Sequence, residues 1–596
     1  MFSILKEVTN DAALRDSLRE KTIEMSNEAI DLFSENIQLY KAIKAYYNGN
    51  AKKEQLTKEQ RYYLDELIKG FVRAGLDKPD ETRIKIKTLK KELAALSIEF
   101  DKNVNGYNKT IEVTREELAG MDDRFINSLP KSASGKFMLN TSYPVLFPIF
   151  EYCTVANTRE KLWRLNANKA YPENQEILDT IIKKRDELAK LLGYTSYAQY
   201  DIDDEMAQNP ERVEQFLNEL IARTNKKERE EHDLLKTDLP ESVTLSSDDK
   251  FYPWDRAHTM AMYKKKHFNI DQREIANYFP MQSTVKGLLD IYHAFFGINF
   301  KELPLSGVWD PDVTLIEVTS QENNELLGYL LLDLYPRPNK YGHACQSTII
   351  PAVQKPDGTR QPALVLVIAN FPKALGDEPS LLELNEVNTF FHEFGHALHA
   401  ILGATQLAGT SGTRVKTDFV ELPSQMLEEW LWDAAILKQL SKHYQTGQPL
   451  SDELIKTIIE QKNFSTGSYI QRQVYLAFIS LLVFQENGVA DTQKLTRMLS
   501  DKIRIHSIFD NDDHFEVSFG HLMGYGAKYY SYLWSKVFAL DLFYYIKERG
   551  LLNSEVGKKY VQKILMPGGS IDPNKLLRDF LGREPNSDAF FKDLGF

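Results

Sequence analysis

Cysteine is scarce in this sequence, which has only Cys153 and Cys345 among 596 residues. Two cysteines cannot build the disulfide framework that is typical of small secreted proteins. The first 21 residues also lack the basic segment, apolar core and cleavage site of a secretory signal, and their acidic residues balance their basic ones, unlike a transit peptide. Both absences favour the cytoplasm.

Long apolar runs and an excess of positive charge are missing too. The longest apolar candidate, around residues 474–484, is too short to cross a membrane and is typical of a buried helix. The formal net charge is -12, so no nucleic-acid partner is expected, because phosphate binding needs a cationic face. The chain is also too long for one compact core, so we expect two or more lobes, or one large helical body with a cleft.

Hydrophobic periodicity predicts a mostly helical protein with one small sheet. Leu89, Leu93, Leu96 and Phe100, for example, recur at helical spacing and form one apolar stripe. Short β-favouring runs, separated by turns such as KPDGTRQP, predict a small sheet within the helical body. The predicted helical stretches are 12–108, 157–237 and 380–548, and the predicted strands are 313–320, 326–335 and 363–370.

The stretch FFHEFGHALHA places two histidines four residues apart on a predicted helix. Ser380 and Glu383 have the spacing of a capping box, and Gly403 is a plausible C-terminal residue, which predicts a helix of roughly 22 residues. His392 and His396 then lie one turn apart on the same face, where two imidazoles can share one Zn²⁺ ion.

Glu393 and His399 lie near these two histidines in the sequence, but we expect different roles for them. Glu393 is displaced by about 100° around the helix, so it cannot easily ligate the same ion but can reach a water on it, as a general base must. The pattern His-Glu-x-x-His arises by chance in roughly 2% of chains with this histidine content, which makes packing the weaker interpretation. His399 is expected to be a surface or hydrogen-bonded group.

A catalytic zinc site needs a third protein ligand, and the following stretch GTRVKTDFVELPSQMLEEWLWD offers four carboxylates. Spacing alone does not choose among them. Pro423 predicts that a helix begins or bends there. Gln425 and Glu428 share a face with Glu421 if the segment is helical, so both could hydrogen-bond ligating groups, whereas Glu429 is expected on a solvated face. The four candidates are Asp418, Glu421, Glu428 and Glu429.

A third stretch, FGHLMGYGAKYYSYLWS, is rich in tyrosine. A neutral tyrosine hydroxyl can donate a hydrogen bond to an oxyanion that forms during a reaction. Tyr529 and Tyr532 can share a helix face, whereas Tyr530 points elsewhere. Gly524 and Gly526 permit a mobile loop that carries Tyr525. Without further information such a stripe would more often belong to a core.

FHEFGHALH followed by GTRVKTDFVELPSQMLEEW resembles the zinc site of the thimet oligopeptidase, neurolysin and mitochondrial intermediate peptidase family of zinc metallopeptidases. The resemblance implies that Glu421, 29 residues after His392, is the third ligand of one zinc ion. It further implies that Tyr532 is the transition-state donor, that His521 assists it, and that Tyr525 and Tyr529 contact substrate.

The same resemblance implies a fold and an activity. We expect a mostly α, two-lobed protein with a deep central channel and a small sheet beside the active site, along whose edge an extended peptide can run. Residues 1–150 would form an N-terminal helical region and residues 151–596 the peptidase region. The implied activity is that of a cytoplasmic zinc oligopeptidase that cuts internal bonds of short unstructured peptides, and we expect a monomer.

Three alternatives stay open at this point. The first two, a dipeptidyl carboxypeptidase and a presequence-processing intermediate peptidase, belong to the same family. The loop HLMGY is one residue shorter than in thimet-like enzymes and is more similar to mitochondrial intermediate peptidase, and Arg414 stands where a histidine is common; both departures concern specificity. The third alternative, from another class, is a catalytically silent peptide-binding scaffold.

Overall fold

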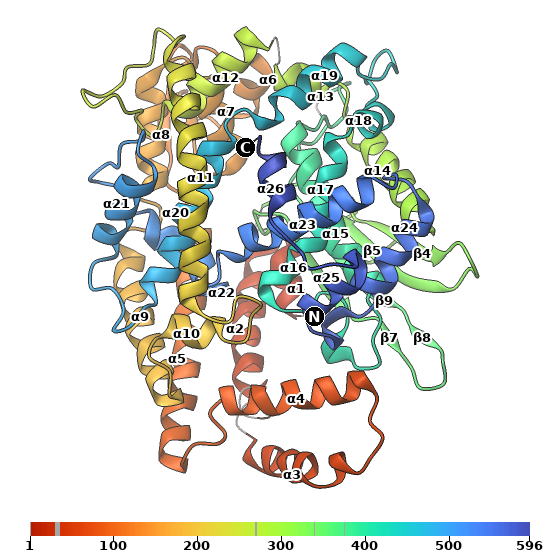
Figure 1. Cartoon of the computed structure of the whole chain (residues 1–596). Helices are drawn as coiled ribbons and strands as arrows, with labels where there is room; N and C mark the ends of the chain where they lie inside the picture. Colours follow the sequence, from red (N-terminus) through yellow and green to blue (C-terminus); the bar gives the residue numbers. More distant parts are fainter. Residues whose placement is uncertain are drawn as a thin grey trace.

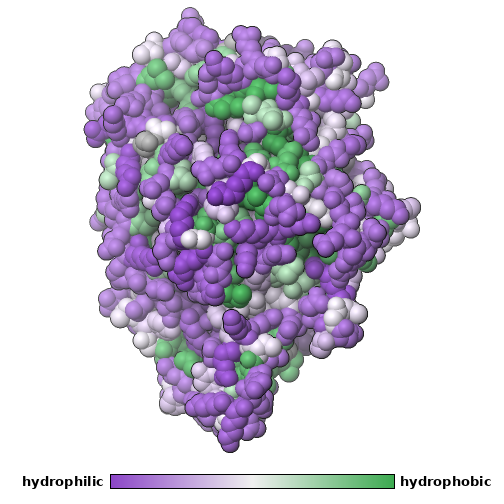
Figure 2. Space-filling view, turned by 45° about the vertical axis from the view of Figure 1, so that its right-hand side comes forward, coloured by the Kyte–Doolittle hydropathy of each residue, from purple (hydrophilic) through white to green (hydrophobic). Residues whose placement is uncertain are grey.

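The computed structural model describes residues 2–29, 32, 36–268, 271–338, 340–374 and 376–595. The protein is mostly helical with a small sheet, as predicted, and its elements form two groups that face each other (Figure 1). Within the described residues, no helix is both long and apolar enough to span a bilayer. On the face seen in Figure 2, hydrophilic residues predominate and hydrophobic side chains gather toward the middle.

The N-terminal quarter of the chain supplies long helices, which confirms the prediction for residues 12–108. Leu89 and Phe100 of the predicted stripe are buried. The helices and short strands up to residue 152 are α1 (Phe2–Val8), α2 (Ala12–Ala29), α3 (Ile37–Asn48), α4 (Lys58–Arg73), α5 (Asp80–Asn105), β1 (Ile111–Val113), α6 (Asp123–Ser128), β2 (Phe137–Leu139) and α7 (Tyr143–Tyr152).

One group of elements, on the left in Figure 1, combines helices from distant parts of the chain. Helix α11 packs along α20, more than 200 residues later in the sequence, and α5 packs along α9. The members that follow α7 are α8 (Ala156–Ala167), α9 (Glu173–Leu192), α10 (Tyr197–Ile202), α11 (Pro210–Lys236), α12 (Arg256–His267), α20 (Thr466–Val483) and α21 (Thr492–Ile503).

The other group holds the sheet and the remaining helices. The sequence interleaves the two groups, since α20 and α21 of the first group follow α19 of the second. These helices are α13 (Gln272–Ala276), α14 (Met281–Phe296), α15 (Leu384–Leu402), α16 (Thr417–Val420), α17 (Leu422–Glu428), α18 (Ala434–Leu440), α19 (Asp452–Glu460), α23 (Ser531–Lys547), α24 (Ser554–Tyr560), α25 (Pro573–Leu581) and α26 (Asp588–Asp593). Helix α22 (His521–Gly524) lies against the first group, where Arg185 of α9 donates to its Leu522 and Met523 carbonyls.

The sheet has the strand order β3-β4-β5-β9-β6, with β5 and β9 parallel and the other neighbours antiparallel. The three inner strands confirm the three predicted runs. Both edge strands were missed, because they are short and only partly buried, so the apolar signal is weak. The strands are β3 (Ile298–Leu303), β4 (Thr314–Ser320), β5 (Leu326–Asp333), β6 (Cys345–Ile350) and β9 (Ala363–Ile368), and β7 (Val353–Gln354) pairs with β8 (Arg360–Gln361) as a hairpin.

Helix α15 packs against β5, β9 and β6, and this packing fixes its orientation. Phe390, Phe391, Phe394 and Leu398 are at most 1% exposed, so the apolar face points into the core. The face with His392 is only partly covered. The fold therefore turns the two histidines away from the core and toward the interior surface between the groups.

The predicted start of α15 is wrong. The helix has 19 residues, and its capping box pairs Glu383 with Glu386, not Ser380 with Glu383. The Ser380 carbonyl accepts a hydrogen bond from Met281 N in an extended segment, so the helix cannot begin there. Gly403 does end the helix, but at φ -77°; a side chain there would meet the Gly412 backbone at 2.7 Å, so close packing is its reason.

Candidate active site

Two histidines of α15 and Glu421, which lies between α16 and α17, point at one another. The ligand atoms of these three side chains all lie within 4.8 Å of one another. Among the described residues, no other group of three or more His, Cys, Asp or Glu side chains is arranged in this way. Glu421 Oε2 is 3.1 Å from Nε2 of both His392 and His396, and the two Nε2 atoms are 3.2 Å apart. Burial raises the pKa of Glu421, but the two imidazoles bring it well below its usual range.

A glycine inside the motif allows this convergence. Helices α15 and α17 pack closely, and a Cβ at Gly395 would lie 2.6 Å from the Cα of Ser424. Only a residue without a side chain lets α17 approach so near. Pro423 stands in the first turn of α17, where its missing N–H costs nothing, as the prediction of a helix start required.

The ring of His392 is held from behind. Its Nδ1 lies 2.7 Å from Glu428 Oε1, and Glu428 Oε2 in turn accepts from Lys536 Nζ at 3.1 Å. A histidine whose Nδ1–H goes to a carboxylate presents a lone pair at Nε2, which is the arrangement that metal-binding histidines adopt. Glu428 therefore lies behind His392, in contact with its Nδ1.

The predictions for Gln425 and Glu429 need correction, and Asp418 is not a ligand. Gln425 hydrogen-bonds no ligating group: its amide donates to the Tyr532 carbonyl, because α17 packs against α23 there. Glu429 does not lie on a solvated face; its side chain is 3% exposed and pairs with Lys462 and Lys536. Asp418 turns away from the histidines, and its carboxylate accepts hydrogen bonds from the backbone N–H groups of Met206 and Ala207.

His399 is neither a surface group nor a hydrogen-bonded one. Its side chain is fully buried, and neither ring nitrogen has a partner among the residues that the structure describes. Burial lowers the pKa of His399 to about 3, with a smaller contribution from His396. The ring is thus a neutral packing group in the core side of α15.

Glu393 lies beside the first ligand, as the helix geometry requires. It is 7% exposed, and its carboxylate makes no hydrogen bond to another described residue. Burial raises the pKa of Glu393, and the charges of His392 and His396 oppose this rise. Its oxygens are therefore available to a small molecule next to the histidines.

The tyrosine stretch forms the opposite wall of the site. Tyr532 hydroxyl and His521 Nε2 are 3.4 Å apart, and Tyr525 donates to Glu421 Oε1 at 2.8 Å. The ring of Tyr529 packs on Tyr532 with centroids 5.1 Å apart, and its hydroxyl donates to Gln473 of α20. The stretch thus brings together all four residues that the sequence pointed to.

Tyr530 points elsewhere, as the helical spacing predicted. It is fully buried and donates to Asp418 at 3.1 Å.

Burial raises the pKa of Tyr532 far above its usual range and the charge of Glu421 adds to this effect, so its hydroxyl keeps its proton. For His521, burial lowers the pKa to about 4.

The donor set fits one zinc ion. Three atoms that ligate a tetrahedral ion at 2.0–2.1 Å lie about 3.3 Å from one another, close to the 3.1–3.2 Å seen between the two Nε2 atoms and Glu421 Oε2. Two imidazoles and one carboxylate are also the ligand chemistry of catalytic zinc sites that keep a fourth position open. His392 and His396 are each partly exposed, so that position is reachable.

A comparison with known families decides the identity. The model of peptidase family M3 matches residues 149–596, which include every residue of the site. The chain belongs to peptidase family M3. The predicted enzyme class, a zinc metallo-oligopeptidase with one zinc ion, is thereby confirmed.

Relatives of this M3 peptidase align over its whole length. Saccharolysin of Saccharomyces cerevisiae is 32% identical, with 100% of this chain and 86% of the relative covered. Oligopeptidase A of Escherichia coli is 31% identical, with 100% of this chain and 89% of the relative covered. Among solved structures, PZ peptidase A with inhibitor 2 covers 100% of this chain and 88% of its own at a TM-score of 0.60; at 13% identity it shows the shared fold.

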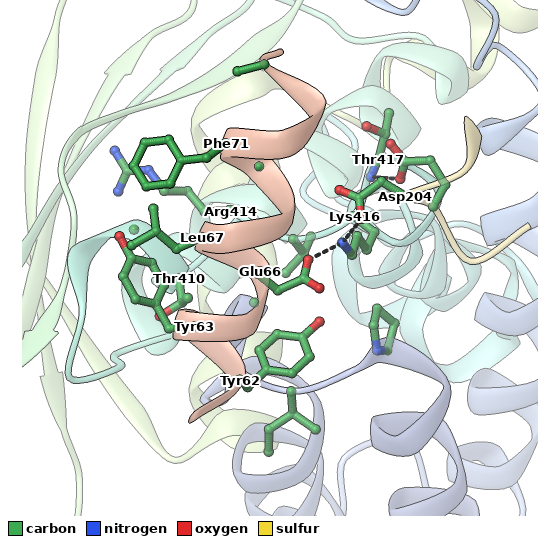
Figure 3. Close-up of a pocket in the computed structure, with 18 residues that line it drawn as sticks. Tyr62, Tyr63, Glu66, Leu67, Phe71, Asp204, Thr410, Arg414, Lys416 and Thr417 are labelled. Atoms are coloured by element: carbon green, nitrogen blue, oxygen red, sulfur yellow. Dashed lines mark hydrogen bonds and ion pairs between the residues drawn. The ribbon is translucent and has the colours of Figure 1, made fainter. Parts of the chain in front are cut away.

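A separate cavity of about 480 Å³ lies between α4 and the segment that leads into α16 (Figure 3). None of the predicted site residues lines it. Lys416 forms its far wall and pairs with Glu66 at 2.6 Å and Asp204 at 2.9 Å. These ion pairs anchor the chain five residues before Glu421. The cavity of this M3 peptidase therefore borders the segment that positions Glu421, and not the zinc site itself.

Sequence reasoning missed Lys536 and the role of Gly395. Lys536 lies one turn after Tyr532 on α23, so the i, i+4 spacing could have placed it on the site face. Its partners Glu428 and Glu429 are more than 100 residues away in the sequence, and no local pattern connects them. In the sequence, Gly395 is only a weak helix former. Its role becomes clear from its close contact with Ser424 of α17 in the structure.

Proposed function

We propose that this M3 peptidase cuts internal bonds of short, unstructured peptides, with zinc held by His392, His396 and Glu421. The observation that carries the proposal is the convergence of these three donors within 4.8 Å. When bound, zinc would polarise the scissile carbonyl and make water a stronger nucleophile. The residues around the donors supply the proton transfers and the orientation.

Glu393 is the proposed general base. A general base must lie near the attacking water and have a carboxylate that is not already engaged. Glu393 meets both conditions, because it neighbours His392 and has no hydrogen-bond partner in the described chain. It takes a proton from the attacking water and delivers it to the leaving amine.

Tyr532, with His521, is the proposed oxyanion donor. The raised pKa of Tyr532 keeps the hydroxyl proton in place, and its 3.4 Å distance to His521 Nε2 orients it. A donor that strengthens as the oxyanion forms lowers the barrier more than it tightens substrate binding. Tyr525 and Tyr529 flank Tyr532 and are the proposed substrate contacts.

Strand β6 is the proposed track for the peptide. It pairs only with β9 in the described sheet, so its other edge offers free backbone groups, and α15 packs beside it. An extended peptide adds to such an edge through main-chain hydrogen bonds, which do not depend on its side chains. A channel between the two groups of elements would admit only unfolded peptides.

The remaining assignments are proposals of the same kind. The low cysteine content supports a cytoplasmic site of action, and the family includes relatives named as mitochondrial intermediate peptidases. Short peptides are the proposed partners, and a monomer the proposed state. The division at residue 150 into an N-terminal helical region and a peptidase region also remains our proposal.

A ladder of peptides tests the function. Peptides of about 5 to 40 residues with one repeated composition are digested with and without a chelator, and the products are identified by mass spectrometry. We expect cleavage at internal bonds of the short peptides and no cleavage of the longest peptides where these are folded. With chelator, no peptide should be cleaved. Release of C-terminal dipeptides alone would instead assign a dipeptidyl carboxypeptidase, and no cleavage at all would leave a silent scaffold.

A further inference from the structure

Arg472 is an exposed arginine on α20 that has no carboxylate partner among the residues that the structure describes. Neither a hydrogen bond nor an ion pair joins its guanidinium to any residue in the described parts of the chain. Most of the other arginines form an ion pair with an Asp or Glu side chain. An unpaired guanidinium beside an active site is available to a ligand, and its planar donors suit carboxylates.

Arg472 lies where α20 crosses to the tyrosine wall of the site. The next residue, Gln473, accepts a hydrogen bond from Tyr529 at 3.1 Å, and the ring of Tyr529 lies 5.0 Å from that of His521. Burial raises the pKa of Tyr529, and the charge of Arg472 is the largest effect that opposes this rise. The guanidinium is thus near the residues proposed to contact substrate.

The surroundings of Arg472 are aromatic and open. Tyr469, one turn earlier on α20, is 56% exposed, and Tyr143 of α7 is 47% exposed. Burial raises the pKa of both phenols and the charge of Arg472 opposes this rise, while the charge of Glu428, behind the zinc ligands, adds to it for Tyr469. Arg472 therefore stands on an exposed surface between the back of the zinc site and α7.

A second cation, Arg504, lies nearby and is influenced by the charges of both Arg472 and Asp513. Arg504 is partly buried, and its guanidinium lies 5.6 Å from the ring centroid of Tyr475, one turn after Arg472. Burial lowers the pKa of Arg504, and the positive charge of Arg472 contributes to that. Within the described chain, neither arginine has an ion pair with an acid. Two positive groups that repel each other at one place favour an anionic ligand there.

We propose that Arg472 binds a carboxylate of the peptide substrate, with Arg504 adding to the positive field. The inference rests on the proposed peptidase function and names a specificity determinant within it. Two sources share this chemistry, namely the C-terminal carboxylate of a short peptide and an acidic side chain. A peptide that places either group at Arg472 while its scissile bond reaches the zinc ligands would be cut preferentially.

The test uses one neutral peptide sequence in three forms, measured with zinc-loaded enzyme. One form has a free C-terminus, one has an amidated C-terminus, and one is amidated but carries a single glutamate, scanned through successive positions. Each is digested by the wild type, by Arg472→Gln and by Arg229→Gln. The last variant is a matched control, because Arg229 is an exposed arginine on the neighbouring helix α11.

We expect Arg472→Gln to lower kcat/KM for a carboxylate-bearing form roughly 10- to 100-fold, mostly through KM. The amidated neutral peptide should change less than twofold, and Arg229→Gln should leave all forms unchanged. Loss confined to the free C-terminus assigns the terminal carboxylate, and loss confined to one glutamate position assigns a side-chain subsite. Equal effects on charged and amidated peptides would overturn the proposal, whereas absence of cleavage of any form would overturn the peptidase function instead.

Discussion

Lys536 Nζ lies 3.1 Å from Glu428 Oε2, and the other oxygen of Glu428 holds the ring of His392. The ammonium also contacts Glu429 Oε1 at 2.7 Å, and Lys462 pairs with the other oxygen of Glu429. Although burial raises the pKa of Glu429, the two ammonium groups bring it to about 2. A buried chain of alternating charges thus supports one zinc ligand from behind.

Replacing Lys536 with methionine should weaken zinc binding. Partners behind a metal ligand typically contribute 10- to 100-fold in affinity, so we expect a loss of that size in a competition with a chromogenic chelator. The control Arg583→Met breaks an ion pair with Asp541, whose side chain is 3% exposed and which follows Lys536 on α23. If both variants lower the melting temperature but neither changes zinc affinity, Lys536 has only a structural role. Lys536→Arg should restore part of the affinity.

Glu393→Gln should keep the metal and lose turnover. The amide cannot take a proton from water, and general-base catalysis contributes roughly 10²- to 10⁴-fold. Zinc content is measured on the sample used for kinetics. Glu386→Gln, at the start of the same helix, should retain its rate because its carboxylate caps the helix. Normal kcat in the Glu393 variant would remove this residue from the mechanism.

Tyr532→Phe should lower kcat by roughly 10²- to 10³-fold with little change in KM, because the lost hydrogen bond acts on the oxyanion and not on the bound substrate. The matched control is Tyr530→Phe, since that hydroxyl donates to Asp418 away from the site. Its loss should cost stability while kcat stays within a few-fold. An unchanged kcat in the Tyr532 variant would point to Tyr525 as the donor.

His521 should not titrate in the working range of the enzyme. Burial, followed by the charge of His343, lowers its pKa to about 4, below the 6.5 of an exposed imidazole. The folded protein therefore takes up this proton less readily than the unfolded chain, and it loses stability as the pH falls from 6.5 toward 4.

His521→Gln should accordingly lower kcat by the same factor at pH 5.5 and at pH 8, and its unfolding free energy should fall less with acid than that of the wild type. Urea unfolding and kcat across this range measure both effects. A rate ratio that changes tenfold near pH 6.5 would show a charged histidine in the mechanism and contradict the neutral one.

Local patterns predicted the elements whose signal is local. The apolar face of α15, the separate face of Tyr530 and the inner strands of the sheet all follow from spacing, because burial on one side repeats with the period of the element. The edge strand β6 has no such repeat, since it is only half-buried. Ser380 had the right residue type for a cap but pairs with Met281 instead.

Contacts between distant segments could not be predicted from spacing. Glu421 was chosen among four acids only through the family resemblance, because its approach to the histidines depends on how α17 packs on α15. Glu429 looked solvated because its two lysine partners lie 33 and more residues away. His399 was misjudged because the core that covers it comes from other elements.

The most direct test of the account is a zinc titration of the metal-free enzyme, with peptide cleavage followed at each addition. Since His392, His396 and Glu421 form one donor set in the described chain, activity should rise linearly and level off at one equivalent of zinc, and His396→Ala should show no rise at that equivalence. Full activity in the metal-free enzyme, or a break at two or more equivalents, would contradict a single catalytic zinc held by these three residues.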